Sequence, residues 1–100
     1  MRLNDNEIES IISLANRHFG ENVQVFLFGS RTDNQKQGGD IDLFIRNPDG
    51  KQPTIRAKIN FVADLILRIG EQKIDVVIDH PAAQNSLFFK TIFQTGIQLC

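Results

Sequence analysis

The order of hydrophobic patterns along the chain constrains the fold more than any other feature of the sequence. Three segments have apolar residues at the three- and four-residue spacing of a helix face, and three shorter segments are rich in Val, Ile and Phe or alternate as strands do. The predicted order is helix, strand, strand, helix, strand, helix. This order predicts an α/β (α+β) fold, a small mixed β-sheet with helices packed on one face.

The three predicted helices differ in how clearly their ends are marked. The first is expected to begin after an N-cap at Asn4 or Asp5 and to end at Gly20. The second is expected over residues 54–69, and the third over residues 85–95. The buried stripe expected on the second helix consists of Ile55, Ile59, Val62, Ile66 and Ile69. The buried side expected on the third consists of Phe88, Phe89, Ile92 and Phe93.

The predicted strands cover residues 23–28, 41–45 and 73–78. The first two flank a polar, Gly-rich loop, so we expect them to pair as neighbours. A chain of 100 residues fits one domain with one core, spanning residues 1–100. No run of apolar residues approaches the length of a membrane span, so no membrane association is expected.

Acidic residues recur on the predicted strands at positions that share a face. Asp40 and Asp42 are two residues apart and project to the same side, while Ile41 points to the core. Asp75 repeats this arrangement on the third predicted strand. If the strands are neighbours, the three carboxylates form one exposed patch.

Such a patch favours a divalent cation. Two like charges ~4 Å apart repel by about 4 kcal/mol at an effective dielectric constant near 20. Hard carboxylate oxygens suit Mg²⁺, which keeps water and phosphate oxygens in its shell. Carboxylates shared between two ions would support in-line displacement at phosphorus. The repulsion is removed by protonation or by a divalent metal, and for the second case the candidate ligands of Mg²⁺ are Asp40, Asp42 and Asp75, with two ions expected.

Gly29, Ser30 and Arg31 follow the first predicted strand and supply groups suited to phosphate. Glycine permits close approach of the backbone, and free N–H groups at a helix start bind phosphate together with a serine hydroxyl. Arg31 has the charge to pair with a phosphate or with an acid of a partner. These residues are the predicted nucleotide-binding segment.

Each of these motifs also has a purely structural interpretation. Gly-Ser before a polar loop is common in turns, and an Asp-x-Asp pair is often the solvated face of a strand. The basic residues around the second helix, Lys51, Arg56 and Lys58, are either a solvated face or a contact for nucleotide or partner. The combined spacing of Gly29-Ser30, the Asp pair and a later Asp is more specific than any one motif.

That combined spacing resembles the nucleotidyltransferase superfamily related to DNA polymerase beta. In that superfamily a strand ending in Gly-Ser is followed by Asp-hydrophobic-Asp-hydrophobic, with a third acid on a later strand. Within it, the chain is similar to the minimal nucleotidyltransferases of bacteria and archaea, which are stand-alone domains. The resemblance rests on Gly29-Ser30-Arg31, Asp40-Ile41-Asp42-Leu43, Lys73-Ile74-Asp75-Val76-Val77 and a closing helix with Ile92, Gly96 and Leu99.

The resemblance implies a polymerase beta palm-like fold and a role for each matching residue. Asp40 and Asp42 would be metal ligands, Asp75 would lie near the attacking hydroxyl, and Gly29 and Ser30 would hold the nucleotide triphosphate. Relatives of this kind are often antitoxins paired with a HEPN-family RNase toxin, and some transfer AMP from ATP to tyrosines of that toxin. The resemblance thus implies ATP as substrate and a HEPN-family toxin as partner, in a prokaryotic cytoplasm.

Three functions are compatible with the residues. The first is Mg²⁺-dependent transfer of AMP to a protein hydroxyl, and because the chain contains no Tyr, a tyrosine target must be another protein. The second is a non-catalytic antitoxin that binds its toxin, favoured by the small size and by the unusual loop residues Thr32-Asp33-Asn34 and Gly38-Gly39. The third is transfer to a small molecule such as an antibiotic. A net charge of −1 argues against stable nucleic-acid binding.

Overall fold

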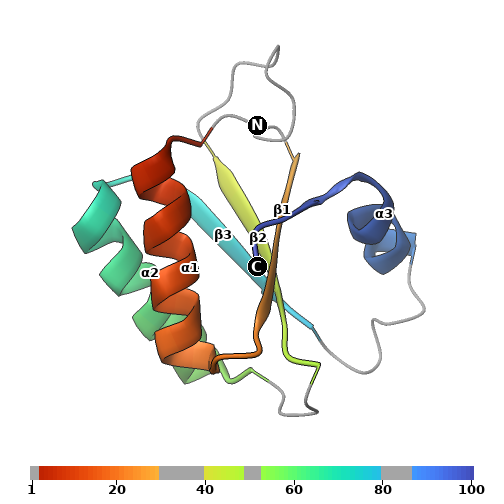
Figure 1. The fold of residues 1–100 in the computed structure, drawn as a ribbon, viewed down its shortest axis with the longest axis horizontal. Helices are drawn as coiled ribbons and strands as arrows, with labels where there is room; N and C mark the ends of the chain where they lie inside the picture. Colours follow the sequence, from red (N-terminus) through yellow and green to blue (C-terminus); the bar gives the residue numbers. More distant parts are fainter. Residues whose placement is uncertain (1–2, 30–39, 49–52, 80–86) are drawn as a thin grey trace.

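The computed structural model describes residues 3–29, 40–48, 53–79 and 87–100, except for the side chains of Phe88 and Phe89. The predicted order of elements is confirmed, and one further short strand follows the last helix (Figure 1). The elements are α1 (Asp5–Phe19), β1 (Gln24–Phe28), β2 (Ile41–Arg46), α2 (Ile55–Ile69), β3 (Ile74–Ile78), α3 (Leu87–Thr95) and β4 (Ile97–Gln98).

The four strands form one mixed sheet in the order β3-β2-β1-β4. β1 pairs antiparallel with β2, as expected for strands joined directly, and Leu27 lies opposite Leu43. β2 pairs parallel with β3, with Leu43 opposite Val76. A parallel pair requires a crossover, which α2 provides. β4 pairs antiparallel with β1, and the backbone N–H of Leu99 donates to the carbonyl of Val25 at 2.7 Å.

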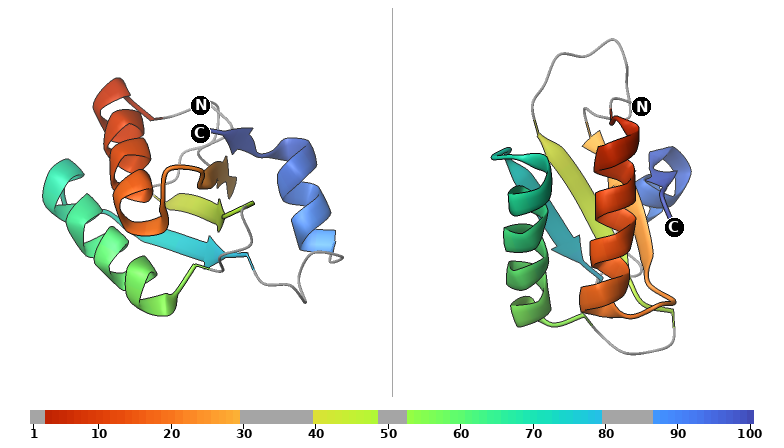
Figure 2. Two further views of the ribbon diagram at one scale, coloured as in Figure 1. Left: turned by 60° about the horizontal axis from the view of Figure 1, so that its bottom comes forward. Right: turned by 60° about the vertical axis from the view of Figure 1, so that its left-hand side comes forward.

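The helices lie on both sides of this sheet (Figure 2). α1 and α2 lie side by side over one face and form the expected helix layer, whereas α3 lies against the opposite face. The main core fills the space between the first face and the two helices. Its fully buried members are Ile11, Ala15, Val25, Leu27, Ile41, Leu43, Ile45, Phe61 and Leu65.

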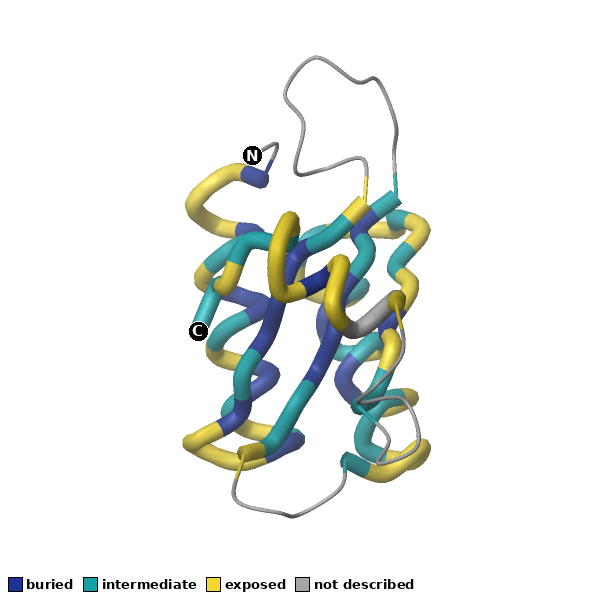
Figure 3. The backbone as a smooth tube through the Cα atoms, turned by 90° about the vertical axis from the view of Figure 1, so that its right-hand side faces the viewer, coloured by how far each residue is buried: buried dark blue, intermediate teal, exposed yellow. Residues whose placement is uncertain are grey.

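A smaller apolar cluster occupies part of the opposite face, beneath α3. It consists of Phe26, Phe44 and Ile92, each at most 5% exposed, with Phe28 packed against it. The ring of Phe93 meets that of Phe26 at 5.0 Å between centroids. Figure 3 views the molecule from this side, with α3 crossing in front of the buried strands. The remainder of this face is therefore available to polar side chains.

The predicted buried stripe of α2 is wrong in part. Ile55 and Ile59 are 73% and 61% exposed, and the buried residues of the helix are Phe61 and Leu65. The helix is turned so that Phe61 enters the core, where its ring lies 5.4 Å from that of Phe19. A phenylalanine buries more apolar area than an isoleucine, so this orientation is favoured.

The start of α1 is stabilised by the predicted N-cap. Asn4 Oδ1 accepts a hydrogen bond from the Glu7 N–H at 2.8 Å, and Glu7 Oε1 accepts one from the Asn4 N–H at 3.0 Å, which is a capping box. The second Glu7 oxygen accepts from Gln72 at 3.1 Å. His18 and Asp64, 2.7 Å apart, join α1 to α2. No helix in the described ranges is long and apolar enough to cross a membrane.

Candidate active site

Two of the predicted carboxylates face each other across the parallel pair of strands. Asp42 on β2 occupies the position directly opposite Asp75 on β3. Asp42 is half-buried and Asp75 is exposed. On its other side Asp42 lies opposite Phe28, the last residue of β1. The face that carries these acids is the one that carries Phe44, because residues two apart on β2 share a face.

Gly29, which follows β1, lies directly against Asp42. Its φ is +78°, a value that L residues with side chains rarely adopt. A Cβ at this position would clash with Oδ2 of Asp42. The backbone angle favours glycine at this position, and a side chain there would in addition displace the Asp42 carboxylate.

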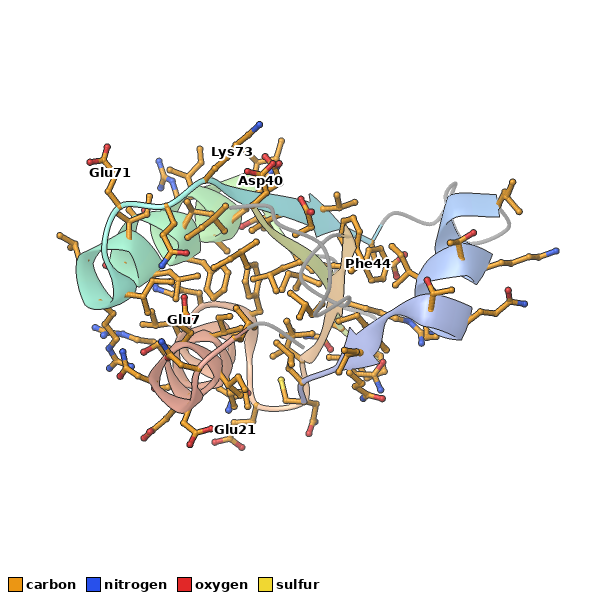
Figure 4. All side chains as sticks on the ribbon, turned by 90° about the horizontal axis from the view of Figure 1, so that it is seen from above. Glu7, Glu21, Asp40, Phe44, Glu71 and Lys73 are labelled. Atoms are coloured by element: carbon orange, nitrogen blue, oxygen red, sulfur yellow. The ribbon has the colours of Figure 1, made fainter. Side chains whose placement is uncertain are left out.

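Asp40 makes an ion pair with a lysine that the sequence analysis did not assign to the site. The Nζ of Lys73 lies 3.6 Å from Oδ2 of Asp40, and the side chains are 70% and 43% exposed, respectively. Figure 4 shows the two residues together at one end of the sheet. Lys73 precedes Asp75 by two residues, so the strand period alone places it on the same face. The two-residue spacing of Lys73 and Asp75 is therefore the sequence signal by which Lys73 could have been assigned to the site.

The surroundings of Asp42 disfavour its ionised form. Burial raises the pKa of this carboxyl above its ordinary value, and the negative charges of Asp75 and Asp40 raise it further. A hydrogen bond between the carboxyl groups of Asp42 and Asp75 acts in the same direction, whereas the charge of Lys73 lowers the pKa. Among the described residues, the three carboxylates thus carry more negative charge than Lys73 offsets.

This arrangement fits a divalent cation in its chemistry. The candidate ligand atoms are carboxylate oxygens, which Mg²⁺ prefers. One of them, Oδ2 of Asp42, occupies the space that the missing side chain of Gly29 leaves free. In the described part of the chain, no group of three or more His, Cys, Asp or Glu side chains converges as a metal-binding set. Asp42 and Asp75 form a pair, and Asp40 is engaged with Lys73.

The structure thus brings Asp40, Asp42, Asp75 and Gly29 to one end of one sheet face. Ser30 and Arg31, the other predicted nucleotide-binding residues, lie outside the described residues. Their expected contacts with phosphate remain predictions.

A further acid lies at the far end of β3. Asp79 is 11% exposed in its side chain, and its Oδ2 lies 3.9 Å from Nε of Arg46. Its Oδ1 is buried and has no hydrogen-bond partner among the residues that the structure describes. Arg46 lies over the ring of Phe93, 5.5 Å from the centroid. Asp79 therefore belongs to the packing of β2, β3 and α3.

The small α+β architecture with its four-stranded mixed sheet is that of a polymerase beta-like nucleotidyltransferase fold. Residues 9–100 match the family described as polymerase beta, nucleotidyltransferase. Because the match covers nearly the whole chain, the chain belongs to this family of nucleotidyltransferases. Members generally use a nucleoside triphosphate and a divalent metal, and the activity class is transferase of the EC 2.7.7 type. A comparison with curated proteins gave no match.

Proposed function

We propose that this chain is a Mg²⁺-dependent adenylyltransferase that moves AMP from ATP to a tyrosine hydroxyl of a HEPN-family toxin, and so acts as its antitoxin in the cytoplasm. The observation that carries the proposal is the placement of Asp42 opposite Asp75 with Gly29 packed against the first carboxylate. A raised pKa at Asp42 supports it, because a site that resists its own charge favours a cation.

In this proposal Asp40, Asp42 and Asp75 would hold the ion. When bound, Mg²⁺ would neutralise their charge and polarise the phosphate oxygens. The missing side chain of Gly29 leaves room for the Asp42 carboxylate, which would hold the ion beside the triphosphate. Lys73, which is largely exposed and lies 3.6 Å from Asp40, would add a positive charge near bound phosphates.

Asp75 is the exposed carboxylate of the pair and is the one best placed to meet an acceptor. It would orient the tyrosine hydroxyl and accept its proton. The phenolic oxygen then forms a bond to the α-phosphorus of ATP, the bond from that phosphorus to the bridging oxygen breaks, and pyrophosphate leaves. The chain itself has no Tyr, so the acceptor is supplied by the partner.

The test uses ATP labelled at the α-phosphate, Mg²⁺ and the purified product of the adjacent HEPN-like reading frame. We expect label on a tyrosine of that protein and none with Asp42→Asn. Asp5→Asn, an exposed carboxylate in the first turn of α1, is the matched control and should transfer as the parent does. Label that persists in Asp42→Asn, or none with any variant, would contradict the proposal.

A second candidate, neutralisation of the toxin by binding alone, is favoured by the exposed apolar residues of α2. Ile55, Ile59 and Leu67 are 73%, 61% and 84% exposed. The double variant Asp40→Asn/Asp42→Asn separates the two candidates in cells that carry the toxin. Protection by this variant would favour binding, whereas toxicity with an intact complex would favour transfer.

A further inference from the structure

The outward side of α2 carries a continuous apolar row. Ile55, Ile59, Ala63 and Leu67 recur every four residues and are all exposed. Three of them are large side chains with 61–84% of their surface accessible. Side chains four apart form the ridge that packs into the groove of a neighbouring helix, and the small Ala63 at its centre permits close approach. α2 is the outermost helix on its side of the molecule (Figure 2).

The unpaired charges that α2 itself carries beside this row are positive, while the exposed acid Glu71 follows the end of the helix. α2 contains Arg56, Lys58 and Arg68, and none of the three forms an ion pair within the described part of the chain. Its single acid, Asp64, is engaged by His18 at 2.7 Å. The free charge of the helix is therefore positive, although the whole chain carries −1.

From these observations we infer that the α2 ridge, defined as Ile55, Ile59, Ala63 and Leu67, docks an amphipathic helix of a partner protein whose apolar stripe is flanked by Asp and Glu. The apolar row supplies the buried contact, and the basic residues beside it select acidic flanks. A second copy of this chain would place the same basic residues against the ridge, so charge argues against self-association.

The ridge and the carboxylates lie on opposite sides of the sheet, and both are close to its β3 edge. α2 packs with α1 on the main core, whereas Asp42 and Asp75 lie on the opposite sheet face. β3, which carries Asp75, is the edge strand, and α2 leads into it. A partner held on the ridge therefore leaves the carboxylates open. The inference does not depend on the transfer reaction, so each can fail alone.

The experiment replaces Leu67 with the photo-crosslinking residue p-benzoylphenylalanine in the full chain, expressed in its own host. Gln94, exposed on α3, is the control position. The expected result is a single protein crosslinked through Leu67 and not through Gln94, joined at an acidic amphipathic helix as mapped by mass spectrometry. The purified partner should then bind at least tenfold more weakly to Ile59→Asn/Leu67→Gln and to Arg56→Glu.

Folding of the variants is checked by circular dichroism and melting temperature, which should change little at positions more than 60% exposed. Four results would overturn the inference: a crosslink to a second copy of the chain, a crosslink to a basic or non-helical segment, no crosslink, or unchanged partner affinity in the variants. Cosedimentation with phosphatidylglycerol vesicles that is lost in Ile59→Asn/Leu67→Gln would assign the ridge to a lipid surface and likewise overturn it.

Discussion

At the scale of single residues, the site depends on the lack of a side chain at Gly29. Asp42 lies where the side chain of residue 29 would otherwise be, so the carboxylate and the glycine determine each other. Gly29 also has the positive φ that only glycine adopts without strain. The Gly-Ser motif therefore has a structural reason for its glycine beyond any contact with nucleotide.

We expect Gly29→Ala to lower the free energy of unfolding by about 1–3 kcal/mol, from backbone strain and from displacement of Asp42. Gly70→Ala is the matched control, because Gly70 has φ +96° but nothing within 4 Å of its Cβ position. Urea unfolding measures both. Adding Asp42→Ala should relieve part of the cost of Gly29→Ala and none of the cost of Gly70→Ala. Equal relief at both positions would contradict the assigned clash.

The raised pKa of Asp42 also predicts a dependence of stability on pH. Because the folded protein binds this proton more tightly, Asp42 increasingly destabilises the fold as pH rises from its ordinary value of 3.8 through the raised folded value. In metal-free buffer, Asp42→Asn should therefore melt higher than the parent at neutral pH, and the difference should shrink as the pH falls to about 4. Melting curves from pH 4 to 8 test this, and a difference that grows toward acid would contradict it.

At the scale of elements, the edge pair β2–β3 arranges charge in a ladder. Asp40 pairs with Lys73, and Asp42 lies opposite Asp75 one step along. The lysine acts on more than its direct partner, since its charge lowers the pKa of Asp42. The strand period thus places one lysine and three acids on the same face.

Replacing Lys73 by Gln should raise the pKa of Asp42 further, because the opposing positive charge is lost. Carbon-13 detected NMR titration of the carboxyl group measures the change in metal-free protein. Lys58→Gln on α2 removes the same charge elsewhere and should leave the titration unchanged. A downward shift in Lys73→Gln would show that the lysine acts differently.

Among the side chains of α3 that the structure describes, Ile92 is the buried one, and Phe93 also contacts Phe26 on the sheet. Ile92 is 2% exposed between Phe26 and Phe44, so Ile92→Ala should lower the free energy of unfolding by about 2–5 kcal/mol. Leu87→Ala on the same helix removes an apolar side chain that is 79% exposed and should have little effect. Denaturant unfolding compares the two variants, and similar losses would mean that the cluster under α3 contributes little.

At the scale of the whole molecule, the sheet separates the main hydrophobic core on one face from the candidate site on the other. One face is fully packed by α1 and α2, and the other is divided between the Phe26–Phe44 cluster and the carboxylates. If the acids bind a cation, the ion stabilises the folded chain alone, because the ligands come together only there.

We therefore expect Mg²⁺ to raise the melting temperature of the parent protein, with a gain of about 2.7 kcal/mol at a concentration one hundred times the dissociation constant. Asp42→Asn/Asp75→Asn should show no such gain, whereas Asp5→Asn should respond as the parent does. Differential scanning calorimetry with and without EDTA measures the effect. A gain that survives the double variant would place the ion elsewhere.

The sequence predicted the main strands and the shared face of the acids because Asp40-Ile41-Asp42 has a strict two-residue period. The orientation of α2 could not be predicted in the same way, because this helix has apolar residues on more than one side. Its orientation depends on the packing of Phe61 in the folded core, which the sequence pattern does not show. β4 has two residues, and its pairing depends on the open edge of β1. The fit of Asp42 against Gly29 depends on backbone geometry and leaves no sequence pattern.

The register of β2 on β3 has a consequence for the order of events during synthesis. Asp75 follows Asp42 by 33 residues (75 − 42), and α2 must cross over before the two can meet. Contacts of such long sequence separation form slowly. A nascent chain that has released β1 and β2 from the ribosome thus carries Asp42 without its partner Asp75. If these carboxylates hold a cation, that capacity arises only when β3 has joined the sheet, so cation binding would report that the fold is complete.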